Sequence, residues 1–150
     1  MNRVFLSLGS NLEPERYIPA CIEALKQKFC INKISSIYET EPVGPAGGGK
    51  FWNAVVGIES AVEPESLNKE LRGIETSLGR KRDPSNKFAP RSIDIDVLPQ
   101  PGYQDQGFIM VPLAEIAPDE MDKKSGKTFL ELAEKFKEEK KHYRKINLVI

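Results

Sequence analysis

Two helical patterns of apolar residues, each flanked by short apolar segments, constrain the fold of this 150-residue chain most strongly. In both patterns the apolar residues recur at i, i+4, i+7 and i+11, which places them on one face of a helix. The two sets are Ile18, Ile22, Leu25 and Phe29, then Leu67, Leu71, Ile74 and Leu78. Four other segments are apolar, aromatic or β-branched without that period, which predicts strands at residues 4–8, 34–38, 51–58 and 91–98.

The resulting order, β-α-β-β-α-β, is that of a split βαβ, or ferredoxin-like, sheet. We therefore predict an α+β fold with helices packed on an antiparallel-type sheet, as a single domain over residues 1–150. Pro14 and Pro64 suit the first turns of the two helices, and Gly79 suits the end of the second. Three later elements are expected: a short strand or extended piece at 108–113, a helix around 129–136 and a strand at 146–150.

The charge balance and the hydropathy exclude several classes of protein. Lys and Arg number 22 and Asp and Glu number 22, so the formal net charge is zero, which disfavours a general nucleic-acid binder. No segment approaches the roughly 20 apolar residues of a membrane helix, and the first residues lack the pattern of a secretory signal. The expectation is therefore a cytoplasmic protein.

The cysteines and the histidine exclude further kinds of site. On a single helix, Cys21 and Cys30 would lie about 13–14 Å apart along the axis, which is too far for a disulfide. Either Cys30 lies past the helix end or both are free thiols. His142 is the only histidine, which excludes a Cys/His zinc site. A Ser-His or Cys-His nucleophile would require His142 to fold into the site.

The strand expected between Pro90 and Leu98 carries the strongest chemical signal. Strand alternation turns Asp94 and Asp96 to one face and the neighbouring apolar residues to the other. Two carboxylates on residues whose Cα atoms are about 6.5–7 Å apart repel each other unless a cation lies between them. Mg²⁺ prefers such oxygen ligands. The alternative is an amphipathic strand with a solvated acidic face, although strands disfavour Asp.

Three arginines lie close to these aspartates in the sequence: Arg80, Arg82 and Arg91. A metal ion with guanidinium groups around it is the arrangement that phosphoryl transfer requires, because catalysis there consists of positioning and of neutralising negative charge. The alternative is that these arginines are surface charges paired with nearby acids. This alternative is strongest for Arg82.

A glycine-rich loop precedes a candidate site for a flat heterocycle. Residues 44–50 satisfy Gly-x₄-Gly-Lys, but Phe51 stands where a P-loop needs Ser or Thr, and a strand pattern follows instead of a helix. We therefore reject a P-loop. Alternation places Phe51 and Asn53 on one face, where an aromatic ring beside an amide suits a heterocycle that bears amide and amino groups. For Trp52 the simpler interpretation is a core residue.

Several motifs in order carry a resemblance that spans the chain from the first strand to about Pro118. They are Leu6–Leu12, Ser36–Gly44, Phe51–Ala54, Ile74-Glu75 with Gly79-Arg80, Pro90–Asp96 and Phe108–Pro118. Together they resemble the 6-hydroxymethyl-7,8-dihydropterin pyrophosphokinases of folate biosynthesis. Any one motif is modest, but their combination in this order is highly specific.

The resemblance implies transfer of a pyrophosphoryl group from ATP, the co-substrate, to the hydroxymethyl oxygen of the pterin, with release of AMP. It implies that two Mg²⁺ ions are held by Asp94 and Asp96. Arg80 and Arg91 would stabilise charge on the transferring and leaving phosphates. Arg82 would lie in a loop that closes over the nucleotide.

The resemblance also implies the remaining substrate contacts. Glu75 would lie beside ATP, and phenylalanine rings would stack on the pterin. The implied pterin site comprises Thr40, Pro42, Val43, Phe51, Asn53 and Phe108. The implied partners are the two small-molecule substrates, with no nucleic acid, no membrane and no obligate protein partner.

The chain departs from the family pattern after Leu98. Only nine residues, Pro99 to Gly107, stand where the family usually has a longer segment with a Pro-His-Pro-like motif. Gln106 replaces an expected arginine and Arg72 a common glutamine. Loss of one charged phosphate contact weakens binding by about 10- to 100-fold. Two alternatives therefore stay open: a pterin- or nucleotide-binding homologue with weak or no transfer, and an interaction module that uses the Lys/Glu-rich residues 127–145.

Overall fold

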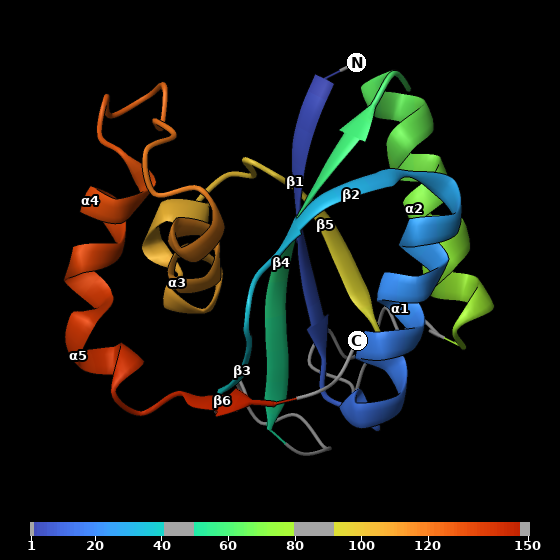
Figure 1. The fold of residues 1–150 in the computed structure, drawn as a ribbon, viewed down its shortest axis with the longest axis horizontal. Coiled ribbons are helices and arrows are strands. Elements are labelled where there is room, and N and C mark those ends of the chain that lie inside the picture. Colours follow the sequence, from blue (N-terminus) through green and yellow to red (C-terminus); the bar gives the residue numbers. More distant parts are fainter. Residues whose placement is uncertain (1, 41–49, 80–91, 148–150) are drawn as a thin grey trace.

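The structure, a computed structural model, describes residues 2–40, 50–79 and 92–147 (Figure 1). Its first elements are β1 (Asn2–Ser10), α1 (Pro14–Lys28), β2 (Cys30–Ile34), β3 (Ile37–Thr40), β4 (Phe51–Ser60), α2 (Pro64–Ser77) and β5 (Asp94–Leu98). The chain continues with the 3₁₀ helix η1 (Tyr103–Asp105), α3 (Gly107–Ile116), α4 (Phe129–Ala133), the 3₁₀ helix η2 (Glu134–Phe136), α5 (Lys137–Lys140) and β6 (Arg144–Ile146). None of the helices among the described residues has both the length and the apolar character needed to cross a membrane.

The sheet has the strand order β5-β1-β4-β3-β6, with β2 also paired to β4, and every pairing is antiparallel. Since β2 and β3 both lie beside β4, together they occupy the second strand position of the predicted β-α-β-β-α-β order. The core order is therefore fourth, first, third and second strand, as in a ferredoxin-like sheet. The predicted fold class is confirmed.

The single strand predicted over residues 34–38 is wrong, because Ser35 and Ser36 interrupt it. Ser35 binds β4 through its own side chain: its Oγ accepts the Val55 N–H at 2.9 Å, while its N–H donates to the Val55 carbonyl at 2.9 Å. Ser36 turns to the Glu115 carboxylate instead. Short polar side chains that bind the backbone in this way compete with regular strand pairing.

Helices cover both faces of the sheet, with α1 and α2 on one side and α3, α4 and α5 on the other (Figure 1). The two predicted helical patterns both face the first side, where Ile18, Ile22 and Leu71 are fully buried against Leu6 and Leu8 of β1. As expected, α1 and α2 begin at prolines, and Gly79, with φ of 85°, follows the end of α2.

The extended piece predicted at 108–113 is wrong, because these residues belong to helix α3. This helix lies between the sheet and α4 and buries eight of its ten residues, so it lacks the polar side that would reveal a helical period. Its one charged residue, Glu115, accepts hydrogen bonds from the Ser36 amide at 2.9 Å and from the Tyr38 hydroxyl at 3.0 Å. A short apolar run of this kind does not distinguish a buried helix from a strand.

The last two predicted elements differ in detail from the observed ones. The helix expected around residues 129–136 is divided into α4, η2 and α5. The strand expected at 146–150 lies earlier, as β6, which shares only Ile146 with the predicted range. Residues 148–150 lie outside the described part of the chain.

The cysteines are both free, and only one of them is accessible. Cys30 is exposed at the start of β2, whereas Cys21 is fully buried on α1. Burial, with a smaller contribution from the Glu75 carboxylate, raises the pKa of the Cys21 thiol to about 12. Cys21 therefore stays protonated at neutral and mildly alkaline pH and does not act as a nucleophile.

We predict that a disulfide reagent such as Ellman's reagent modifies one thiol of the native protein quickly. The second thiol reacts only in denaturant, because Cys21 is buried and protonated. A Cys30→Ser variant should lose the fast reaction altogether. Two thiols that react at the same rate in the native protein would contradict the burial of Cys21.

Candidate active site

The aspartates predicted as metal ligands lie side by side on strand β5, at the edge of the described sheet. Ile93 and Ile95 are fully buried in the core beneath α1 and α2. Asp94 and Asp96 are partly exposed on the opposite face of the sheet. The predicted alternation is therefore confirmed, and both carboxylates face the same side of one strand.

Helix α2 holds the outer edge of β5 through an ion pair between the buried Glu75 and the partly exposed Arg72. Glu75, only 2% exposed, accepts the Ile95 N–H through Oε2 at 2.7 Å and pairs through Oε1 with Arg72 Nη1 at 2.9 Å. The Arg72 guanidinium also donates to the Ile95 carbonyl. The two side chains thus bind both backbone groups of Ile95, as a neighbouring strand would, and fix the backbone between the two aspartates.

A second group of side chains lies on the same face of the sheet, two strands away. In the strand register, Asp94 of β5 pairs with Gly9 of β1, and Gly9 pairs with Asn53 of β4. Directly paired residues share a face, and neighbouring strands are about 4.8 Å apart. The Cα atoms of Asp94 and Asn53 therefore lie about 10 Å apart, with only the backbone of Gly9 between them.

Asn53 is fixed by Thr40 and by the close approach of β1. Its Nδ2 donates to Thr40 Oγ1 at 2.9 Å, and both residues are buried. A Cβ added to Gly9 would lie 3.2 Å from Asn53 Oδ1 and 3.9 Å from the Phe51 ring. A side chain at position 9 would therefore crowd the amide and fill the space between it and the aspartates.

The predicted aromatic and amide residues are brought together as expected. Phe51, Asn53 and Thr40 share one face, because Phe51 pairs with Thr40 in the register and alternates with Asn53. Trp52 points to the other face. There it packs against the apolar core that contains Leu6 and Leu8, and its Nε1 donates to Glu39 at 2.9 Å. Trp52 is thus a partly buried residue at the margin of the core, close to the simpler interpretation.

Phe108 lies on this side of the sheet in the first turn of α3. It is partly exposed and packs against the apolar cluster between α3 and the sheet, which contains Val55 and Leu98. Since Val55 is two residues beyond Asn53 on β4, α3 covers the part of the face that follows the polar row. The start of α3 therefore forms one boundary of the candidate site.

Five predicted site residues lie outside the described part of the chain: Pro42, Val43, Arg80, Arg82 and Arg91. The loop that contains Arg82 and was expected to close over a nucleotide lies outside it too. The described residues contain no group of three or more His, Cys, Asp or Glu side chains that could hold a metal ion. They do offer the carboxylates of Asp94 and Asp96, and one or two carboxylates plus substrate phosphates are the usual ligands of Mg²⁺. The donor set therefore fits magnesium bound together with a nucleotide.

Sequence reasoning assigned no function to Gly9 or to the pairing of Arg72 with Glu75. The strand predicted at residues 4–8 ends before Gly9, whereas β1 continues through it to Ser10. A glycine inside a strand often marks a close approach of a ligand or another chain segment, and this signal could have identified it. The link from Glu75 to Ile95 joins residues far apart in the sequence, so no local pattern reveals it.

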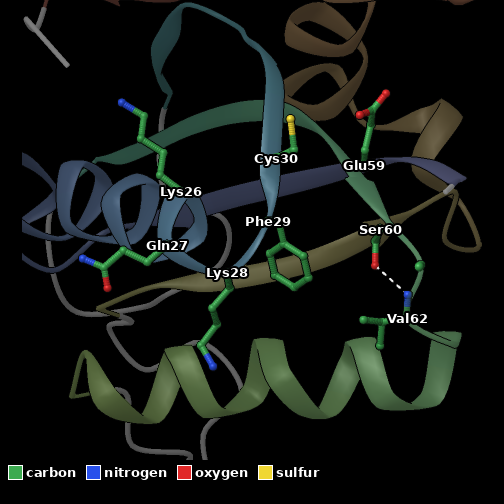
Figure 2. Close-up of a pocket in the computed structure, with 9 residues that line it drawn as sticks. Lys26, Gln27, Lys28, Phe29, Cys30, Glu59, Ser60 and Val62 are labelled. Atoms are coloured by element: carbon green, nitrogen blue, oxygen red, sulfur yellow. Dashed lines mark hydrogen bonds between the residues drawn. The ribbon is translucent and has the colours of Figure 1, made fainter.

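One of the hollows among the described residues lies at the opposite end of the sheet and is a competing location. It has a volume of about 420 Å³ and contains no predicted site residue; it is lined by Lys26, Gln27, Lys28, Phe29, Cys30, Glu59, Ser60, Ala61 and Val62. In Figure 2 the two lysines extend in different directions, and Ser60 Oγ is taken up by the Val62 N–H at 3.0 Å. Glu59 is six residues from Asn53 along β4, about 20 Å away, so this hollow is separate from the row of polar residues.

The family model described as 7,8-dihydro-6-hydroxymethylpterin-pyrophosphokinase matches residues 5–118 of this chain. The chain belongs to this family. The matched range includes the aspartates of β5, Asn53 of β4 and the whole of α3, so it covers every residue placed in the candidate site above.

Curated relatives from distant bacteria agree with the family assignment. The chain is 32% identical over 136 residues to a protein of Pseudomonas aeruginosa, covering 79% of this chain and 83% of that protein. It is 33% identical over 132 residues to a protein of Bacillus subtilis, covering 77% and 78%. It is 35% identical over 136 residues to a protein of Methylorubrum extorquens, covering 79% and 85%. All three are named 2-amino-4-hydroxy-6-hydroxymethyldihydropteridine pyrophosphokinase.

A solved structure supports the fold. The chain superposes with a TM-score of 0.77 on the crystal structure of Plasmodium falciparum HPPK-DHPS, a triple mutant with STZ-DHP. The sequence identity is 13%, and the superposition covers 99% of this chain. It covers only 46% of the Plasmodium chain, so this protein corresponds to less than half of that one.

We predict that Glu75→Ala lowers the free energy of unfolding by about 2–4 kcal/mol, measured by urea denaturation. The change leaves the Arg72 guanidinium and the Ile95 amide without their buried acceptor, and both losses are costly. The matched control is Glu65→Ala, at an exposed position of the same helix, which should cost less than about 1 kcal/mol. Equal losses for the two variants would contradict the edge-binding role of Glu75.

Proposed function

We propose that this chain transfers a pyrophosphoryl group from ATP to the hydroxymethyl oxygen of 6-hydroxymethyl-7,8-dihydropterin, a step of folate biosynthesis. The bond between the α- and β-phosphates of ATP breaks, a bond from the β-phosphate to the pterin oxygen forms, and AMP leaves. The observation that carries the proposal is the row of Asp94, Gly9 and Asn53 in a chain of this family. It sets the carboxylate that we propose binds a cation and the amide that we propose binds the heterocycle on one face, about 10 Å apart.

The pterin is proposed to bind at the Asn53 end of the row. The Asn53 amide can donate and accept, which matches the amino and carbonyl groups of the pterin ring, and Thr40 holds that amide in place. Phe51 and Phe108 supply aromatic rings for stacking. Pro42 and Val43 are proposed to line the same site.

The triphosphate of ATP is proposed to bind at the aspartate end. Asp94 and Asp96 would hold two Mg²⁺ ions, which supply charge neutralisation on the phosphate oxygens when bound. Arg80, Arg82 and Arg91 are proposed to bind the phosphates, since guanidinium groups match their geometry and stay charged. Glu75, expected beside ATP, is buried and binds Arg72 and the Ile95 amide, so we propose that it acts indirectly, by fixing the backbone between the two aspartates.

The absence of a side chain at Gly9 suits this reaction. The pterin hydroxymethyl group must extend from the Asn53 end toward the β-phosphate, and reacting atoms have to approach within about 3–3.5 Å. Within the described strands, Gly9 contributes no side chain between the two ends, and the acceptor arm and the phosphate are proposed to meet above it. Binding both substrates in this geometry makes the transfer effectively intramolecular, which is the main source of rate in phosphoryl transfer.

A binding-only homologue is the second candidate, and the short connection after β5 favours it. The nine residues from Pro99 to Gly107 contain no histidine, and Gln106 stands where an arginine is expected. Within this connection Tyr103 is buried and its hydroxyl donates to Asp122 at 2.8 Å, so the connection packs onto the core. A packed connection that supplies no charged group to a nucleotide would weaken ATP binding.

We expect Asp96→Ala to fold like the wild type and to form no AMP from ATP, Mg²⁺ and 6-hydroxymethyl-dihydropterin. The change removes a phosphate-linked metal ligand but no core contact, because Asp96 is partly exposed. AMP is measured by chromatography, and Asp94→Asn serves as a second variant that keeps the side-chain shape. Unchanged AMP formation in both variants would refute the metal role. Binding of the pterin without AMP formation by the wild type would favour the binding-only homologue.

Asn53→Ala should raise the KM for the pterin by about 10- to 100-fold, with a change of less than about threefold in the KM for ATP. The variant loses the paired donor and acceptor and leaves Thr40 Oγ1 without its partner. Initial rates with each substrate varied in turn give both constants. A rise in the KM for ATP alone would contradict the assignment of this end of the row to the pterin.

A further inference from the structure

Residues 134–146, here called the C-terminal segment, lie beyond the range matched by the family model yet pack beside the proposed pterin site. The segment contains η2, α5 and β6, and β6 adds an edge strand to β3 (Figure 1). In the register, Lys145 pairs with Tyr38, and Tyr38 pairs with Asn53. The row of Asp94, Gly9 and Asn53 therefore continues through Tyr38 to β6.

Tyr143 joins this edge of the sheet to the start of α3. Its ring meets the Tyr38 ring with centroids 6.2 Å apart, and its hydroxyl donates to the Glu139 carboxylate. A Cβ added to Gly107 would lie 2.6 Å from the Tyr143 hydroxyl, 2.1 Å from Glu139 Oε2 and 3.0 Å from the Phe136 ring. The segment thus lies against the residue that precedes Phe108, and a side chain at position 107 would have to displace the ends of the Glu139 and Tyr143 side chains.

Tyr143 contacts Tyr38 on one side of the proposed pterin site, in the sheet, and Gly107 on the other side, at the start of α3. Tyr38 lies on β3, two residues before Thr40 and on the same face of the sheet. Gly107 begins the helix that carries Phe108. A flat ring held between Phe51 and Phe108 needs contacts of about 3.5–4.0 Å on each side. The separation of the sheet from the start of α3 therefore determines whether the ring fits, and errors of about 1 Å are costly.

We propose that Tyr143, through the packing of its ring against Tyr38 beside the start of α3, is a positioning residue that sets this separation and thereby the affinity for the pterin. The proposal rests on the pterin site proposed above. Burial and the Glu139 carboxylate raise the pKa of the Tyr143 hydroxyl, which therefore stays a neutral donor over the physiological range. Tyr143 is not proposed to contact the substrate, and it acts only through β3 and α3.

The test measures KM for each substrate and kcat in Tyr143→Ala, Tyr143→Phe and His142→Ala. Tyr143→Ala should raise the KM for the pterin by about tenfold, with the KM for ATP and kcat changed less than about threefold. Tyr143→Phe keeps the ring against Tyr38 and should restore the pterin KM to within about threefold of wild type. His142 is exposed in the same segment, and its variant should match the wild type.

Three results would overturn the proposal. The first is an unchanged pterin KM in Tyr143→Ala, and the second is a parallel rise in both KM values with a lower thermal midpoint, as a merely structural residue would give. The third is failure of Tyr143→Phe to restore the pterin KM. Asn53→Ala in the same assay distinguishes failure of the positioning role from failure of the pterin site. If Asn53→Ala raises the pterin KM and Tyr143→Ala does not, the pterin site stands and only the positioning role of Tyr143 fails. If neither changes it, the pterin site itself is misplaced.

Discussion

The buried carboxylate of Glu75 is the interaction on which the arrangement of the site depends. A charge that is 98% removed from solvent has to be paired and hydrogen-bonded, and Glu75 meets both needs by binding Arg72 and the Ile95 amide. Because these partners belong to α2 and to an edge strand, the pair attaches β5 to the body of the protein. Among the described residues, it binds the side of β5 that faces away from β1.

Because side chains alternate along each strand, the main core and the polar residues of the candidate site lie on opposite faces of the sheet. The face toward α1 and α2 carries the larger apolar core, with Leu6, Leu8 and Ile95 fully buried. The opposite face is apolar only beneath α3 and α4 and carries its polar row beyond them. Substitution of a polar residue in that row therefore alters the site while it leaves the main core intact, which is why kinetic and stability measurements on this chain can be interpreted separately.

The parts of the fold that could be predicted are those governed by local periodicity. The helices α1 and α2 show one apolar side, and β5 alternates Asp with Ile, so their faces follow from the sequence alone. Helix α3 could not be identified, because a segment buried on all sides has no polar side to mark its period. The contacts of Glu75 with Ile95 and of Tyr143 with Tyr38 join distant residues, so they depend on the tertiary fold.

The glycine at position 9 affects how independently the aspartate end and the Asn53 end of the site can change. Strand β1 contributes backbone alone at this position, so among the described strands no side chain of residue 9 links one end to the other. A change in the acceptor end, on β3, β4 or α3, leaves the phosphate end on β5 unaltered. The scaffold is thus modular across the sheet, and a new acceptor molecule could be accommodated by redesign of one side without any change to the nucleotide side.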